Sequence, residues 1–192
     1  MTKINRKLIL PIAVLAAAAL IAAFWFFHRA GDEHDHTSPL SLEQFKLADQ
    51  YQYGDIEWGS PVNRVMSALP YSITADSRIS GNLPEHVSYY ISGNQLSLDG
   101  QSALASFEFY DNKLQTVKFD FHLDENYEEW YNKQVEALRQ LYGKESDQME
   151  NSSSTMSSKG YKWEAGDTTL QLILLTGTSI KPAATLGVGV KQ

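Results

Sequence analysis

The sequence predicts an α+β fold: an N-terminal transmembrane helix, then a mostly antiparallel sheet with two helices packed on one face. Three observations support this prediction. Residues 8–27 form an uncharged run of 20 residues. Apolar and polar residues alternate over residues 114–123, which is typical of a half-buried strand. Apolar residues over 127–142 recur at helical spacing.

The first 27 residues predict a membrane anchor. Lys3, Arg6 and Lys7 precede the apolar run Leu8–Phe27, whose helical length matches the ~30 Å hydrocarbon core of a bilayer. Because basic residues stay on the cytoplasmic side, we expect residues 1–7 in the cytoplasm and the rest of the chain outside, in a single-pass cell-membrane protein. The alternative is a signal peptide cleaved near Ala17–Ala19.

The next segment, residues 28–50, is predicted to be a polar tether to a domain over 51–192. Residues 28–36 are polar and show no apolar period. Within the tether, Ser41–Ala48 has the pattern of a short helix, with Ser41 as N-cap and Gln44 at the capping-box position.

The two helices of the domain have clear end signals. The first is expected to start with Ser60 as N-cap and Pro61 in its first turn, and to stop before Pro70. The second is expected over 127–142, with Asn126 as N-cap and Gly143 as the C-terminal stop.

The strands are predicted from alternation and from turn residues. The alternating apolar residues of both strands are odd-numbered: Ala103, Ala105, Phe107 and Phe109 in the first, and Val117, Phe119, Phe121 and Leu123 in the second. Pairing them on one face requires a loop of odd length. We therefore expect a three-residue turn over 110–112, with Asn112 in the left-handed region. Residues 144–159 are polar and are predicted to form a surface loop. The other expected strands are 86–91, 95–98, 161–165, 168–175 and 186–190.

Composition excludes several functional classes. The chain has no cysteine, which excludes disulfides, thiolate metal sites and a cysteine nucleophile. Residues 30–192 carry twelve Lys or Arg against 23 Asp or Glu, a net charge of −11. Nucleic acid is an unfavourable partner for so acidic a domain. No phosphate-binding glycine loop or nucleophile-elbow motif occurs, and we expect no cofactor.

Two groups of residues are candidates for a site. Lys118, Asp120 and His122 share the polar face of one predicted strand and form the candidate binding surface. His34 and His36 lie among acidic residues in the tether, and imidazole with carboxylate could bind zinc or copper. A flexible tether holds ligands in fixed geometry poorly, so we assign no metal site there.

Several short segments resemble small bacterial cell-envelope domains, many of them membrane-anchored or lipoproteins of unassigned activity. The similarity lies in Trp58–Val65, Phe109–Leu114, Leu141–Lys144, Trp163 and Thr168–Leu170. The resemblance implies an envelope location and an α+β fold, and it implies no chemistry. The lipobox cysteine of the lipoproteins is missing here.

The sequence therefore suggests a non-enzymatic, membrane-anchored binding or adaptor domain for an envelope protein or other envelope component. One alternative is an envelope hydrolase that uses carboxylates or His122. Another is a metal or pH sensor that uses the tether histidines.

Overall fold

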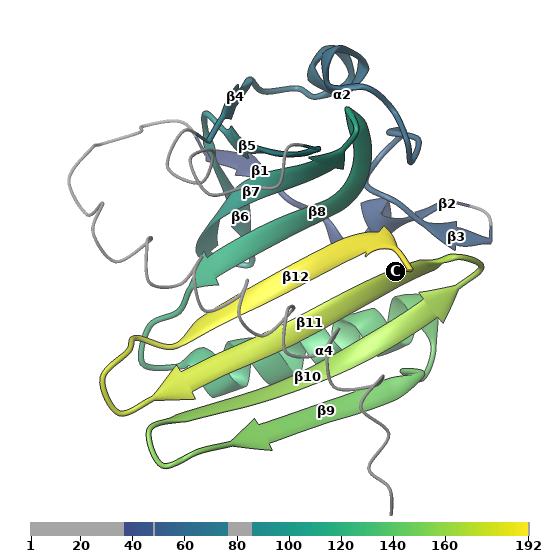
Figure 1. Ribbon diagram of the computed structural model, residues 1–192. Helices are drawn as coiled ribbons and strands as arrows, with labels where there is room; N and C mark the ends of the chain where they lie inside the picture. The colour runs from purple at the N-terminus through teal and green to yellow at the C-terminus, as the bar shows by residue number, and fades with distance from the viewer. Residues whose placement is uncertain (1–36, 48, 77–85, 192) are drawn as a thin grey trace, which may run out of the picture. The chain divides into compact units, whose positions relative to one another are not determined.

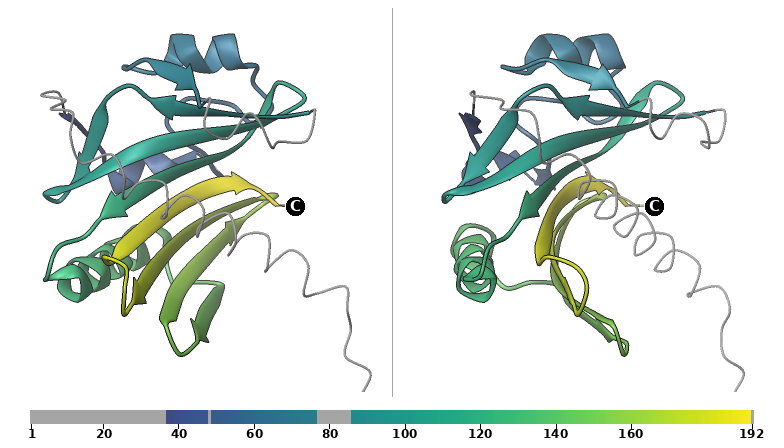
Figure 2. Two further views of the ribbon diagram at one scale, coloured as in Figure 1. Left: turned by 60° about the vertical axis from the view of Figure 1, so that its left-hand side comes forward. Right: turned by 90° about the vertical axis from the view of Figure 1, so that its left-hand side faces the viewer.

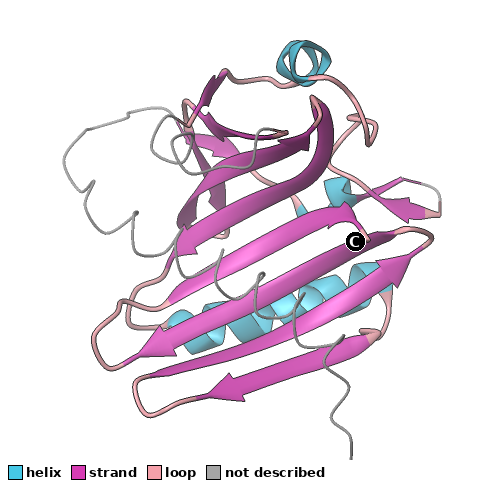
Figure 3. Cartoon of the chain, in the orientation of Figure 1, coloured by secondary structure: helices cyan, strands magenta, loops and turns pink. Residues whose placement is uncertain are grey.

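The computed structural model describes residues 37–47, 49–76 and 86–191, which belong to one compact unit. Strands make up 52% of the described residues and helices 19% (Figure 3). The predicted α+β class, with two helices packed on one face, is therefore wrong: the domain is mainly β. Polar segments that show no apolar period in the sequence are also paired into the sheet.

No helix in the described ranges is long and apolar enough to span a membrane. The predicted anchor, residues 8–27, lies outside those ranges.

One ten-stranded sheet dominates the described part of the chain (Figure 1). Its main path runs β1-β6-β7-β8-β12-β11-β10-β9; β5 also pairs with β7, and β4 with β5. The pairing is antiparallel except between β1 and β6. The strands are β1 (Thr37–Pro39), β4 (Ile73–Ala75), β5 (Val87–Ser92), β6 (Gln95–Leu98), β7 (Gln101–Tyr110), β8 (Lys113–His122), β9 (Asp147–Ser152), β10 (Met156–Ala165), β11 (Thr168–Gly177) and β12 (Ala183–Val190).

The long helix α4 (Tyr127–Tyr142) lies along one side of this sheet (Figure 2). Tyr131 is fully buried, and its hydroxyl lies 3.1 Å from the carbonyl of Lys159 and 3.2 Å from that of Leu172. The indole of Trp130 donates to the carbonyl of Leu98 at 3.3 Å. The helix bounds match the prediction, although Asn126 makes no side-chain capping bond.

The other helix, α2 (Val62–Ala68), has only seven residues and buries only Val65. It begins one residue later than predicted, with Pro61 rather than Ser60 at the N-cap. Both end signals are short-range, so the sequence locates this helix to within a residue.

The β7–β8 turn differs from the predicted three-residue loop. Tyr110 pairs with Lys113, and Asp111 and Asn112 form a two-residue turn with φ values of 49° and 58°. A two-residue turn with positive φ at both residues has a backbone twist that matches the right-handed twist of the strands it joins. The register then shifts, because Phe109 faces Leu114 whereas Glu108 faces Thr116. The extra residue, Gln115, restores the parity that keeps both apolar sets on one face.

The predicted polar loop over 144–159 is largely sheet. Residues 147–152 form β9, and β10 starts at Met156. Five of the six residues of β9 are exposed, so burial leaves no alternating pattern in its sequence. Backbone pairing with β10 is what makes this segment a strand.

The folded domain begins before the predicted boundary at residue 51. The tether segment 37–50 contains β1, a 3₁₀ helix η1 (Leu42–Phe45), β2 (Lys46–Leu47) and the first residue of β3 (Gln50–Tyr51). Ser41 does cap η1 by accepting from the amide of Glu43. Phe45 is fully buried and packs edge-on against Phe119, 5.4 Å between ring centroids.

Candidate functional site

The three predicted site residues lie together on the side of the sheet away from α4. In β8 the alternate residues Val117, Phe119 and Phe121 are buried in the core. Successive side chains of a strand point to opposite faces, so Lys118, Asp120 and His122 share the other face. We call this surface the outer face and define it by Glu108, Lys118, Asp120, His122 and Thr185.

Neighbouring strands place small residues beside these charged side chains. Lys118 pairs with Ser106 of β7 and Gly187 of β12, and Asp120 pairs with Leu104 and Thr185. The outward residues of β12 are all small: Ala183, Thr185, Gly187 and Gly189. The Lys118 side chain lies against Gly187, where an added Cβ would be 3.8 Å from its Cγ.

Asp120 is held by its neighbour on β12. The hydroxyl of Thr185 donates to Oδ1 of Asp120 at 2.6 Å. Burial raises the pKa of Asp120, while the Thr185 hydrogen bond and the charge of Lys118 act in the opposite direction. The site thus holds a carboxyl group whose charged form is disfavoured by desolvation.

The flanking residues of the outer face are also partly desolvated. Burial lowers the pKa of His122, and the charge of Lys181 adds to this effect. Lys118 Nζ lies 3.8 Å from Oε2 of Glu108. Burial, followed by interactions with Glu108, raises the pKa of Tyr89 to about 12. This surface offers hydrogen-bond donors, acceptors and both signs of charge.

The polar groups of the outer face do not form a metal centre. Within the described ranges, no three His, Asp or Glu side chains gather closely enough to hold a metal ion. The metal candidates His34 and His36 lie outside those ranges. Polar contacts on the outer face join Asp120 to Thr185 and Lys118 to Glu108.

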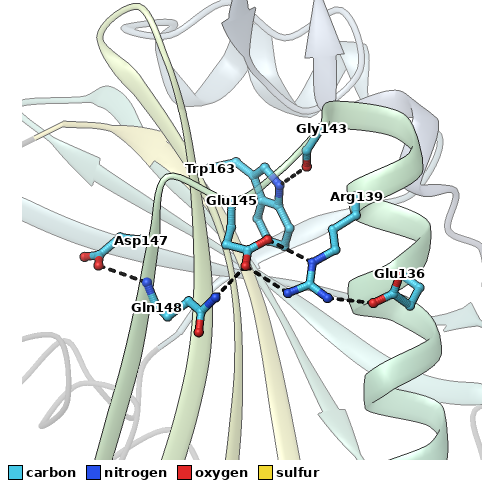
Figure 4. Close-up of polar contacts among 7 residues, drawn as sticks. All are labelled: Glu136, Arg139, Gly143, Glu145, Asp147, Gln148 and Trp163. Atoms are coloured by element: carbon cyan, nitrogen blue, oxygen red, sulfur yellow. Dashed lines mark hydrogen bonds and ion pairs between the residues drawn. The ribbon is translucent and has the colours of Figure 1, made fainter.

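The sequence gives no sign of a second polar cluster, at the C-terminal end of α4 (Figure 4). Arg139 donates from Nε to Oε2 and from Nη2 to Oε1 of Glu145, each at 2.8 Å. Only 3% of the Glu145 side chain is exposed. The Arg139 hydrogen bonds lower the pKa of Glu145 to about 2. Arg139 also lies over the ring of Tyr161, 5.0 Å from its centroid.

This cluster connects three elements. Gln148 of β9 donates to Oε1 of Glu145 at 2.6 Å, and the Trp163 indole of β10 donates to the carbonyl of Gly143 at 2.9 Å (Figure 4). Gly143 ends α4 with φ of 84°. Because every strong contact of Glu145 is internal, we interpret the cluster as a clasp that joins the helix end to β9 and β10.

Comparisons of this chain with protein-family models, curated proteins and solved structures give no match.

Proposed function

We propose that this chain is a non-enzymatic, single-pass membrane protein whose folded domain binds a protein or another component of the cell envelope through the outer face. The observation that carries the proposal is the half-buried Asp120, held by Thr185 beside Lys118 and His122 on the side of the sheet away from α4. Desolvating charged groups costs stability. A cluster that incurs this cost outside the α4 core is better suited to binding than to folding.

We expect the ligand to carry both acidic and basic groups rather than charges of one sign. Lys118 and Asp120 are two residues apart on β8, and Glu108 lies on the adjacent strand β7, opposite Thr116. A partner with hydrogen-bonding groups and both charges would complement them. Because the domain has a negative net charge, we also expect basic residues around the binding surface of the partner.

The experiment is site-specific photo-crosslinking in the full chain in its own membrane. A photoreactive residue replaces Gln171, which lies in the row of Gly187 and Lys118 on the outer face. The matched control replaces Gln140, an exposed residue of α4. We expect one discrete adduct from position 171, none from 140, and loss of the adduct when Lys118→Glu is added.

Two results would contradict the proposal. The first is the same set of adducts from both positions, with no effect of Lys118→Glu. The second is a hydrolytic activity that Asp120→Asn and His122→Ala both abolish while the circular dichroism spectrum stays unchanged. That activity would support the hydrolase alternative instead.

A further inference from the structure

The strand β9 forms one edge of the sheet and pairs only with β10 among the described strands. At the end of this hairpin, the amide of Ser153 donates to the carbonyl of Met156 at 2.8 Å. Hydrogen-bonded positions alternate along an antiparallel pair, so the amides of Gln148 and Glu150 point away from β10. Consistently, the backbone amide of Gln148 donates to Oδ1 of the neighbouring Asp147 at 2.9 Å rather than to a carbonyl of another strand.

The sequence of this edge is complementary to its own reverse. Residues 147–151 read acid, amide, methionine, acid, amide: Asp-Gln-Met-Glu-Asn. When two such strands run antiparallel about a two-fold axis at Met149, Asp147 faces Asn151 of the second copy, and Glu150 faces Gln148. Each carboxylate then lies opposite an amide that can donate a hydrogen bond to it.

Other registers lack this match. The two faces of the joined sheets stay aligned only if the register shifts in steps that keep paired residues on one face. The nearest such shift toward the hairpin loop places Glu150 opposite Glu150, where like charges repel. The shift in the other direction shortens the ladder and leaves Glu150 beside Ser146. The register centred on Met149 is therefore preferred.

The clasp at Glu145 prepares one of the required donors. One hydrogen of the side-chain amide of Gln148 is donated to Glu145. An amide nitrogen carries two hydrogens, so the second is available for Glu150 of the other copy. Glu150 makes no ion pair with another described residue.

We propose that β9 joins a second copy of this chain edge to edge, antiparallel, about a two-fold axis at Met149. The two sheets become one continuous sheet across the axis, as closed two-fold symmetry allows. In this arrangement the Asp147 carboxylate releases the backbone amide of Gln148. It accepts a hydrogen bond from the side-chain amide of Asn151 of the second copy instead. The proposal uses no residue that defines the outer face and does not depend on the proposed function.

A single-cysteine experiment tests the axis, because the chain has no native cysteine. Opposed residues at a non-hydrogen-bonded antiparallel position have Cα atoms about 4.5 Å apart, within disulfide range. The full chain carrying Met149→Cys is oxidised in membranes with copper phenanthroline. We expect a disulfide-linked dimer to form at least about tenfold faster than from the exposed control Gln140→Cys.

The register has its own test. Asp147→Cys and Asn151→Cys should each give little dimer alone, because each thiol then faces a non-cysteine residue. Co-expressed in one membrane, they should give the mixed dimer at a rate near that of Met149→Cys. A mixed pair that reacts no faster than either variant alone would overturn the proposed register.

Edge variants separate strand pairing from random collision. Glu150→Pro removes an amide that points away from β10, so the β9–β10 ladder is kept. Adding it to Met149→Cys should slow dimer formation about tenfold, with an unchanged circular dichroism spectrum. Asn151→Asp should slow it by placing Asp opposite Asp147, and Asn151→Lys should not. Equal rates for Met149→Cys and Gln140→Cys, or no effect of Glu150→Pro, would overturn the dimer.

Discussion

Arg139 and Glu145 form two parallel hydrogen bonds, each 2.8 Å long, that connect the last turn of α4 to the segment leading into β9. The same guanidinium donates from Nη1 to the exposed Glu136 at 2.6 Å. One arginine therefore makes a buried and an exposed ion pair, which gives a matched comparison of the two.

Glu145→Gln should destabilise the domain by about 1.5–3 kcal/mol at pH 7, the range for hydrogen bonds to charged groups. The control Glu136→Gln should cost less than about 0.5 kcal/mol, because the Glu136 side chain is 62% exposed. Urea unfolding monitored by tryptophan fluorescence measures both. Equal costs for the two variants would contradict the assignment of Glu145 as the buried anchor.

The contribution of Glu145 should also depend on pH. Its pKa of about 2 lies below the ordinary value of a glutamate, 4.5. Its stabilisation is thus complete above the ordinary value and is lost as the pH falls through the folded-state value. The difference in unfolding free energy between the native chain and Glu145→Gln should therefore shrink from pH 5 and disappear near pH 2. A difference independent of pH would refute the linkage.

Two glycines of β12 should respond differently to alanine. At Gly189 an added Cβ would lie 2.8 Å from the backbone oxygen of Gln115, which cannot move aside easily. At Gly187 the nearest atom is Lys118 Cγ at 3.8 Å, an ordinary contact. We expect Gly189→Ala to cost about 1–3 kcal/mol and Gly187→Ala to be nearly neutral. Thermal unfolding of both variants measures the contrast, and a neutral Gly189→Ala would show that the strand shifts freely.

Asp120→Asn should stabilise the domain while weakening binding. Burial raises the pKa of Asp120, so its charged form opposes folding at neutral pH. The amide oxygen of Asn can still accept from Thr185 but carries no charge. The variant should therefore unfold at a higher temperature than the native chain at pH 7, and the two should converge at acidic pH, where Asp120 is protonated. A lower melting temperature of the variant at pH 7 would mean that the Asp120 carboxylate stabilises the folded domain.

The predicted membrane anchor can be tested directly. The full chain should sediment with membranes and resist carbonate extraction, because a 20-residue apolar helix is held by the hydrocarbon core. Removing residues 1–27 should release the protein to the supernatant with the circular dichroism spectrum of a mainly β domain. Release of the full chain by carbonate, or a mature N-terminus after Ala19, would favour the signal-peptide alternative.

The elements that the sequence predicted well are those with a local signature. The helix over 127–142 has a 3.6-residue apolar period and a terminal glycine, and both bounds were predicted correctly. The strands β7 and β8 alternate large apolar residues with polar ones, because one face is packed in the core. The shared face of Lys118, Asp120 and His122 follows from the same alternation, so the sequence could identify it.

What the sequence could not predict depends on contacts between distant residues. β9 has a polar sequence, and it is a strand because β10 pairs with its backbone. The bulge at Gln115 arises because the turn at Asp111 and Asn112 has two residues where the core requires odd parity.

Local sequence patterns specify the long helix, the alternating strands and the face on which the polar residues of β8 lie. Long-range packing instead makes the fold mainly β, and it places Thr185 next to Asp120 and Arg139 next to Glu145. These two groups of features differ in the range of the interactions that specify them. Periodicity and end signals act over a few residues of one segment, whereas strand pairing and the burial of a charge depend on which remote segment is adjacent.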